Sequence, residues 1–594
     1  MKSAPLAAAV ALLTAVPALG QYSADPLNNL LVADQAYEEA QPKLVPTADG
    51  GCYVSWFAND PGGSPAGGYD VRLQRLDAAG RPEWAAGGIL IADRGFSSTQ
   101  DYGLAVDSTG HALLAFRDDR VGGTQITAQR VTPAGLPLWG PLGVQLTATT
   151  DFLAAPKVCG TTDGSVVVAW TQNNTVHLQR LDANGVATWP SDAVLPAGSG
   201  ANSLSDLNAS DSGSAIFSYV VDGGTFGSPR HLYAQKIAPT QTPLWNPAGV
   251  ALLDSGSLQF GNFPTFEPDG AGGGLFTWYT SSPQLESFAQ RLDAAGNELF
   301  PHNGSRVATT FGQIWVGPTL AFDPAEQELF VVCEELDASQ TFSNVLVQKF
   351  DAAGNRQWGD AGKVVQAVQG NISLGIADLN PGGVDGVLVV FADSTAGFGQ
   401  TTLHQARLDD AGTPTGPIGG VSTAAATKYR LTVASTALGH VLCTWQDEGS
   451  GSADVAVQDV LPDGSLGGVA GTTQLLGSGA NPVALVAATD PRIGQVFSVA
   501  VDKSPAPGAT LTALFIYGAA SPPVPLPQGE LLVDVTSPLV GFSLVAGPTS
   551  ADAHLLPVPL AIDLVGIGLA AQAAIVGGGG GDVLTNGLAL TLGL

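Results

Sequence analysis

An eleven-residue phrase recurs along this chain and constrains its fold more than any other feature. Its starts lie 55, 50, 56, 55, 58, 58 and 52 residues apart. The copies read QRLDAAGRPEW (74–84), QRVTPAGLPLW (129–139), QRLDANGVATW (179–189), QKIAPTQTPLW (235–245), QRLDAAGNELF (290–300), QKFDAAGNRQW (348–358), ARLDDAGTPTG (406–416) and QDVLPDGSLGG (458–468). A period of this size indicates a repeat architecture rather than a set of unrelated domains.

Each repeat is predicted to be a four-stranded antiparallel sheet. In the first copy, LVPTADGGCYVSWFAND gives two short strands around an Asp-Gly-Gly turn, DVRLQRLD gives a third and RPEWAAGGILIAD a fourth. One such sheet cannot bury both of its faces, whereas a ring of copies can. We therefore predict an all-β fold in which residues 21–466 form an eight-bladed β-propeller. The segment NNLLVAD (28–34) is similar to fourth-strand ends such as GILIAD, so this N-terminal strand is expected to close the last blade.

The tryptophans and the recurrent cations of the repeat are both interpreted as structural. Nine of the ten tryptophans fall at two positions of the repeat, which packing between blades explains better than a single sugar-binding platform does. One set ends the phrase and the other ends the second strand: Trp84, Trp139, Trp189, Trp245 and Trp358, then Trp56, Trp170, Trp278 and Trp445. The cation at the second position of the phrase is followed two residues later by Asp in most copies, as in Arg75 and Asp77. Residues i and i+2 share a strand face, so a surface ion pair is predicted.

The phrase resembles the tryptophan-docking motif of quinoprotein propellers, which has Asp, then Gly, then Trp four residues later. Here Gly80 and Trp84 keep that spacing, but Asp77 lies one residue closer to the glycine than in the family. Quinoprotein propellers are typically eight-bladed, so the resemblance implies that architecture. The chain has no vicinal cysteine pair and no haem-attachment motif, which argues against quinone-dependent oxidation.

Residues 467–594 are predicted to form a small C-terminal β-sandwich, because short apolar runs there are broken by Pro and Gly. The pieces PRIGQVFSVAV, ALFIYGAASPPVPLPQGELLVD, LPVPL, GLAAQAAIV and LTNGLALTLG resemble a C-terminal domain of secreted proteins from planctomycete-type bacteria. That resemblance implies export or surface attachment rather than chemistry. Where that family often carries a cysteine, this chain has Glu530.

Charge and targeting signals indicate an extracellular protein. Residues 1–20 carry a lysine, a short apolar run and small residues at the end, the pattern of a cleavable signal peptide. The formal net charge of −29 excludes nucleic acid as a partner. No later stretch is long and apolar enough for a transmembrane segment, so the mature chain is expected to be secreted or bound at the cell surface.

The four cysteines, Cys52, Cys159, Cys333 and Cys443, lie in apolar strand-like runs and are predicted to be buried free thiols. Cys52 and Cys443 belong to the first and last repeats, which are neighbours in a closed ring. They are the one pair for which the sequence leaves a disulfide bond as an alternative to two free thiols.

Candidate functional residues lie in the loops between the second and third strands, where repeat length varies most. These loops carry several carboxylates, which are predicted to form a ligand-binding face: Asp118, Asp119, Asp222, Glu334, Glu335, Asp393 and Asp447. Oxygen ligands of this kind could hold calcium, although acids are common in the loops of any acidic protein and no cofactor is assigned. HExxH, GxSxG and Walker motifs are absent from the sequence, so no catalytic residue is identified.

The favoured functional hypothesis is a non-catalytic binding or scaffold module for an extracellular glycan, protein or matrix polymer. Two alternatives stay open. One is an extracellular polysaccharide-cleaving enzyme, because paired carboxylates from distant repeats can meet on a propeller. The other is a structural coat or matrix component, suggested by the apolar tail. The sequence does not indicate the ligand or the oligomeric state.

Overall fold

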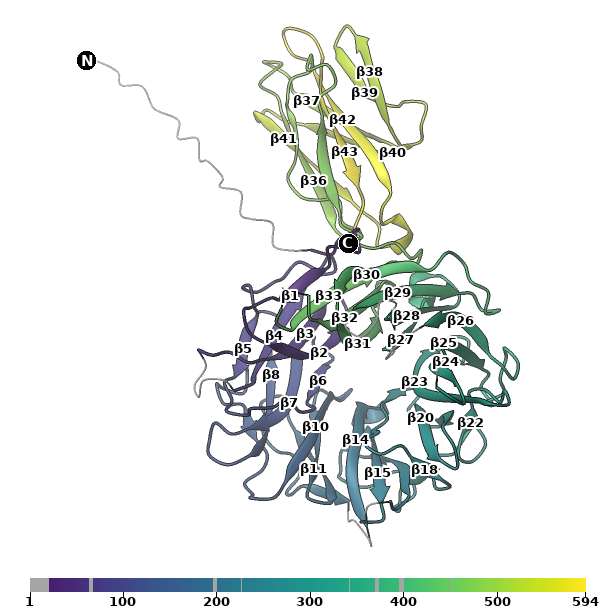
Figure 1. Ribbon diagram of the computed structural model, residues 1–594. Coiled ribbons are helices and arrows are strands. Elements are labelled where there is room, and N and C mark those ends of the chain that lie inside the picture. Colours follow the sequence, from purple (N-terminus) through teal and green to yellow (C-terminus); the bar gives the residue numbers. More distant parts are fainter. Residues whose placement is uncertain are drawn as a thin grey trace, which may run out of the picture.

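The computed structural model describes residues 21–62, 68–195, 200–225, 227–340, 342–368, 373–394, 400–449 and 451–594, so the predicted signal peptide lies outside the described residues. Within this part the chain forms a ring of antiparallel sheets around a central axis, followed by a separate β-domain at one edge of the ring (Figure 1). Eight of the described sheets make up the ring, which confirms the predicted β-propeller. We number them as blades 1 to 8 in chain order.

Each blade contains four main strands, and the first strands of neighbouring blades contact one another around the axis (Figure 1). Blade 1 consists of β2 (Glu39–Pro46), β3 (Cys52–Ala58), β4 (Asp70–Leu76) and β5 (Ile89–Ala92), and blade 2 of β6 (Gly103–Val106), β7 (Ala112–Asp118), β8 (Gln125–Val131) and β9 (Val144–Gln145). Blade 3 consists of β10 (Leu153–Gly160), β11 (Val166–Gln172), β12 (Thr175–Leu181) and β13 (Ala193–Leu195), and blade 4 of β14 (Ala201–Ala209), β15 (Ala215–Asp222), β16 (Arg230–Ile237) and β17 (Val250–Leu253).

In blade 5 the first strand is divided into two short segments that both pair with the same second strand. Blade 5 consists of β18 (Ser257–Leu258), β19 (Phe266–Pro268), β20 (Gly274–Ser282), β21 (Glu286–Leu292) and β22 (Ser305–Arg306), and blade 6 of β23 (Gln313–Asp323), β24 (Glu328–Asp337), β25 (Ser343–Phe350) and β26 (Lys363–Val368). Blade 7 consists of β27 (Leu374–Asp378), β28 (Val387–Asp393), β29 (Thr401–Leu408) and β30 (Gly419–Ala426), and blade 8 of β31 (Lys428–Ser435), β32 (Val441–Asp447), β33 (Asp454–Val460) and β1 (Leu30–Ala33).

The N-terminal strand closes the ring as predicted. Strand β1 pairs antiparallel with β33, with Leu30 opposite Val457, and so supplies the outer strand of blade 8. Tyr22 lies just before this strand, is buried, and donates its backbone N–H to the carbonyl of Ala79 in the phrase of blade 1. Its ring packs against Gly80 so closely that a Cβ there would lie 2.6 Å from a ring carbon. Tyr22 thus occupies the place that a phrase tryptophan takes at five of the other joints.

The phrase tryptophans join consecutive blades. Trp139 of blade 2 donates its indole N–H to the carbonyl of Ala183 in the phrase of blade 3 at 3.1 Å, and its ring covers Gly185 of that phrase. Trp84, Trp189, Trp245 and Trp358 make the corresponding bond to the next phrase, at 2.7 to 3.1 Å. In most copies the phrase glycine has a left-handed φ and the ring of the preceding blade lies on it, whereas Gln241 holds this position in blade 4 with a φ of 69°. Packing between blades therefore accounts for both the tryptophan and the glycine of the phrase.

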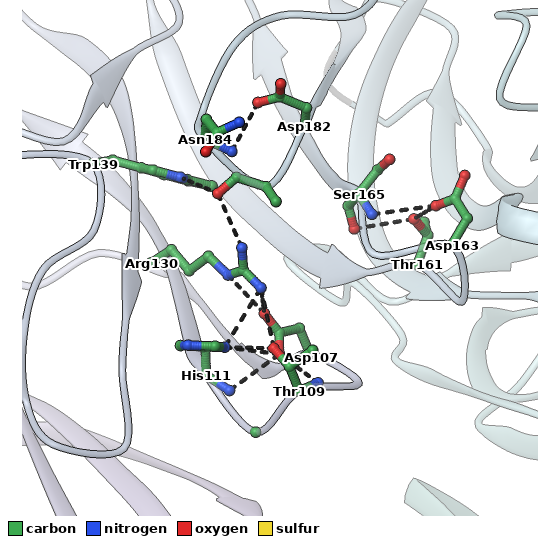
Figure 2. A network of polar contacts seen from close by, with 12 residues as sticks. Asp107, Thr109, His111, Arg130, Trp139, Thr161, Asp163, Ser165, Asp182 and Asn184 are labelled. Atoms are coloured by element: carbon green, nitrogen blue, oxygen red, sulfur yellow. Dashed lines mark hydrogen bonds and ion pairs between the residues drawn. The ribbon is translucent and has the colours of Figure 1, made fainter.

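The recurrent cation does not pair with the aspartate two residues later, so that prediction was wrong. Arg130 is buried and bonds instead to Asp107 in the first turn of its own blade, and its Nη1 donates to the Ala183 carbonyl of the next blade (Figure 2). The phrase aspartate caps its own turn, as Asp182 does by accepting the N–H groups of Asn184 and Val186. These local bonds satisfy the carboxylate within the turn.

The hydrophobic core lies between the blades. Each of its clusters joins side chains from two neighbouring sheets, and Trp56, Trp170, Trp278 and Trp445 at the ends of second strands are almost fully buried in them. The four cysteines are buried and free, as predicted, and Cys52 and Cys443 form no bridge.

The C-terminal β-sandwich is present as predicted. A five-stranded sheet and a three-stranded sheet share one hydrophobic core, with a two-stranded hairpin beside them. Its strands are β34 (Gly471–Leu475), β35 (Leu485–Ala487), β36 (Val496–Asp502), β37 (Leu511–Tyr517), β38 (Ala520–Leu526), β39 (Gly529–Val533), β40 (Leu539–Ala546), β41 (Ala551–Pro557), β42 (Gly568–Val576) and β43 (Val583–Thr591). It contacts blade 1 through the ion pair of Arg492 with Asp77 at 3.1 Å and through Ile493, which packs with Ala79.

Candidate functional site

The carboxylates predicted as a ligand face lie on one side of the ring but are bonded separately. Asp118 is fully buried and ion-paired with Arg120, whereas Asp119 accepts the Gly95 N–H. The other five lie near the ends of second strands. Asp222 accepts the Gly224 N–H, Glu334 accepts the hydroxyl hydrogen bond of Ser343, and Asp393 is buried. Glu335 and Asp447 accept the indole N–H groups of Trp315 and Trp445. Their role in binding a ligand stays a prediction.

Within the described residues, one group of three acidic side chains has the spacing of a metal site: Glu326, Glu328 and Asp410. None of them belongs to the predicted face. The ammonium group of Lys349 already bonds both Glu328 and Asp410, so a cation occupies the centre of this group. Calcium binding remains a prediction.

A different set of charged residues surrounds the propeller axis. We define the axial cluster as Lys43, Asp101, Lys157, Asp206 and Glu267, which lie on or just before the first strands of blades 1 to 5. Asp101 bridges the two lysines, with its Oδ1 2.7 Å from Lys43 Nζ and its Oδ2 2.6 Å from Lys157 Nζ. The backbone N–H of Phe266 donates to Asp206 Oδ2 at 3.1 Å, which places Glu267 next to Asp206. Five blades thus contribute to one continuous polar group.

Backbone bulges position this cluster. In β2, β10 and β14 the pairing register shifts by one residue immediately before Lys43, Lys157 and Asp206. Gln41 and Ala155 within two of these bulges, and Arg430 in the matching bulge of β31, have φ values of 52°, 47° and 56°. Left-handed conformations cost energy in residues other than glycine and persist where the surroundings impose them, often beside functional sites.

The two neighbouring carboxyl groups of the cluster have different surroundings. Glu267 is exposed on the axis, yet the ring encloses it, and this partial loss of bulk water raises its pKa to about 7, with the charges of Asp206 and Asp378 adding to the effect. Burial also raises the pKa of Asp206, but Lys157 and the Phe266 N–H oppose the rise. A carboxyl group whose pKa is raised to about 7 therefore lies beside a second one whose ionised form a cation and an N–H group favour, which is the arrangement used for acid and base roles.

The electrostatics favour the charged forms of Asp101 and Lys157, whereas burial and the like charge of Lys157 lower the pKa of Lys43. Burial would raise the pKa of Asp101, but Lys157 and Lys43 together bring it well below its usual range. Burial lowers the pKa of Lys157, but Asp101 and Asp206 outweigh it and the net pKa is raised. The Asp101–Lys157 pair therefore stays ionised at neutral pH and fixes the positive charge of Lys157 next to Asp206.

The sequence interpretation missed the axial cluster because it concentrated on the loops. A signal was present: Lys43, Lys157 and Asp206 each lie thirteen residues before the second-strand aromatic residue of their repeat, Trp56, Trp170 and Tyr219. Most other repeats have an uncharged residue at that position, such as Gly103 or Thr432. Charged residues at one repeat position of an apolar first strand indicate an axial polar group.

Comparisons with solved structures found similarities at low identity and low TM-score. The structure is similar to a PL25 ulvan lyase, with a TM-score of 0.39 and 12% identity over 66% of this chain and 97% of that chain. It is also similar to a eukaryotic initiation factor (TM-score 0.37, 11% identity, 74% and 89%) and to a Penicillium chrysogenum α-L-arabinanase (TM-score 0.30, 13% identity, 51% and 92%). No family model and no curated protein matches the chain.

These comparisons contradict the favoured hypothesis of a non-catalytic binding or scaffold module. Polysaccharide lyases and arabinan-degrading enzymes are among the similar structures, which agrees better with the alternative of a polysaccharide-cleaving enzyme. The non-catalytic hypothesis is therefore withdrawn. The likeness itself extends to the fold, so a catalytic assignment has to come from the residues of this chain.

The C-terminal domain exposes apolar side chains along the edge strand β40, where Val540, Phe542 and Leu544 are each about half exposed. Leu555 on the neighbouring strand β41 is also exposed. The hypothesis of a coat or matrix component stays untested. No helix among the described residues combines the length and the apolar character needed to cross a membrane.

Proposed function

We propose that this protein is an extracellular polysaccharide-cleaving enzyme whose acid–base pair is Glu267 and Asp206. The observation that carries the proposal is the adjacency of these two carboxyl groups on the axis, one with its pKa raised to about 7 and the other beside Lys157. Glycosidic bond cleavage commonly uses two carboxyl groups in these two states. Export agrees with the predicted signal peptide and with a polymeric substrate that cannot enter a cell.

In the proposed reaction Glu267 donates its proton to the glycosidic oxygen as the bond from that oxygen to the anomeric carbon breaks. Water adds to the anomeric carbon, and the Asp206 carboxylate accepts the proton that the water loses. The charge of Lys157 favours the ionised form of Asp206 against the effect of burial, while Asp101 holds Lys157 in place. The reaction moves one proton from Glu267 to the leaving oxygen and one from water to Asp206. It replaces the C–O bond to the leaving sugar by a C–O bond to water, so it is a hydrolysis.

The test is the release of reducing ends from a panel of soluble polysaccharides. Glu267→Gln and Asp206→Asn should each lower the rate by about 10²–10⁴-fold because each removes one proton-transfer group. The matched control is Glu326→Gln, an exposed carboxyl group outside the axial cluster, which should leave the rate unchanged. Thermal unfolding of each variant checks that it folds. Full activity in folded Glu267→Gln would overturn the proposal.

The pH dependence provides a second readout of the same pair. Because the acid must be protonated, the rate should fall as the pH rises through about 7, the pKa of Glu267. Because the base must be ionised, the rate should also fall at low pH, below a pKa of Asp206 that is raised above its usual value. A rate that stays constant from pH 6 to about pH 9 would contradict the role of Glu267.

A further inference from the structure

A second polar cavity lies away from the axis, between blades 4 and 5. Its volume is about 920 Å³, and its lining includes Asp222, Arg230, Asp254 and Phe260. The lining comes from the loop after β15, from the link between the two blades and from the end of β20. The cavity therefore opens on the side of the ring that carries the second-to-third-strand loops. Several hundred cubic ångströms is the usual size of a small-ligand site.

Arg230 supports two phenylalanine rings at this cavity, Phe260 and Phe263. Its Nη1 donates to the Gln259 carbonyl at 2.6 Å and its Nη2 to the Asn262 carbonyl at 3.3 Å, so it fixes the link between the blades. Its guanidinium also lies 5.7 Å from the ring centroid of Phe260 and 5.0 Å from that of Phe263. Phe260 is held in this way although 75% of its surface is exposed. An exposed aromatic ring with an ordered support is a preformed stacking surface.

The charge of the cavity defines which ligands it accepts. Asp222 and Asp254 contribute carboxylates, of which Asp254 Oδ1 lies 3.2 Å from Nε2 of His302 and leaves its Oδ2 for a ligand. The guanidinium of Arg230 is already bonded to two carbonyls and lies 3.9 Å from Asp222. The whole chain carries a formal charge of −29. A uronate or sulfate group would therefore be repelled. Sugar hydroxyl groups, by contrast, can donate to the carboxylates in charge-assisted hydrogen bonds.

The cavity is aligned with the proposed catalytic pair. Ala201, the first residue of β14, lines the cavity, and Asp206 lies five residues further along the same strand. At about 3.3 Å per residue this separates them by about 17 Å along the strand. A polymer that contacts both has to span this separation.

We propose that this cavity is a distal subsite for an uncharged sugar residue, stacked on Phe260 and hydrogen-bonded to Asp222 and Asp254. This rests on the proposed function and extends it, because it assigns the substrate to the neutral polysaccharides. The chemistry that the subsite recognises is an apolar sugar face with hydroxyl groups around it and no anionic substituent.

The experiment uses the full-length Glu267→Gln protein and its Phe260→Ala double variant, so that cleavage does not interfere with binding. Titration calorimetry with neutral oligosaccharides of increasing length should show binding about tenfold weaker in the double variant for the long chains, because one stacking contact is lost. The matched control replaces Phe311, which is fully exposed but does not line the cavity, and should bind like the parent. Carboxylated or sulfated chains should bind more weakly than neutral ones.

Unchanged affinity in the Phe260→Ala variant would overturn the subsite, as would an equal loss from Phe311→Ala, which would indicate general apolar adhesion. Tighter binding of anionic chains would overturn the assignment to neutral sugars. The proposed function fails separately: if Glu267→Gln still cleaves the polymer, the acid–base pair is wrong, while the comparison of the two phenylalanine variants still decides the subsite.

Discussion

Several ionisable side chains of this protein are buried, and Glu39 is one of them outside the axial cluster. Its side chain is fully buried on β2. Its Oε2 accepts the Gln35 N–H, and within the described part of the chain its Oε1 has no hydrogen-bond partner. Burial raises the pKa of Glu39 to about 7, and the charges of Asp454 and Asp34 act in the same direction. Such a group stabilises the fold when protonated and destabilises it when ionised.

Replacing Glu39 by Gln should stabilise the fold at pH 8 and change little near pH 4.5. The folded-state pKa is higher than the unfolded one, so the stabilising contribution is present below the unfolded pKa and lost as the pH rises through about 7. The gain at pH 8 should reach at most about 3 kcal/mol, from the size of the pKa shift. Urea unfolding at the two pH values measures it. Glu326→Gln, an exposed glutamate that does not contribute to the pKa of Glu39, is the control, and an equal gain at both pH values would contradict the account.

The residues of the axial cluster show what the sequence could and could not predict about the site. Lys43, Lys157 and Asp206 hold one repeat position and were detectable from spacing alone. Glu267 was not, because the first strand of its blade is split into β18 and β19 and its pKa depends on neighbours from other blades. Proximity across blades is a property of ring closure, which no local pattern encodes.

At the scale of the element, the repeat phrase predicted the blades and the tryptophan joints, but not the partner of its cation. Asp49, Asp107, Asp163, Asp211 and Asp269, in the first turns of five consecutive blades, each pair with the phrase cation of their blade. The phrase aspartate was the nearer candidate by sequence. It caps its own tight turn, where the backbone N–H groups are closer than any side chain can be.

The contribution of one joint can be measured at Trp139. Trp139→Ala should destabilise the fold by about 3–5 kcal/mol because it removes a buried ring. Trp139→Phe should cost only about 1 kcal/mol, the value of the lost hydrogen bond to Ala183. Blade 5 supports this difference, since Phe300 stands at the same position and still covers Gly354 of the next phrase. Chemical unfolding compares the two variants, and equal losses would show that the hydrogen bond, rather than the ring, joins the blades.

At the scale of the whole molecule, the fold depends on joining the two ends of a long repeat. Residues in β1 and β33 are separated by more than four hundred positions in the sequence, yet they form adjacent strands of one blade. The joint between blades 8 and 1 has no phrase tryptophan, because the eighth copy of the phrase ends in Gly-Gly. Tyr22 replaces that ring by packing on Gly80, so the N-terminal segment provides both the closing strand and the missing aromatic contact.

Closure by this segment predicts a graded loss of stability. Tyr22→Ala should cost about 3–5 kcal/mol because a buried ring is removed from the joint. Leu27→Ala, in the same segment but exposed, should have little effect and is the matched control. Deleting residues 21–34 should lower the melting temperature further and produce oligomers on size-exclusion chromatography, because the unpaired edge of β33 can then pair with another chain. A deletion variant that stays monomeric with an unchanged melting temperature would show that the ring holds without β1, and the closing contacts would then have to come from blades 1 and 8 alone.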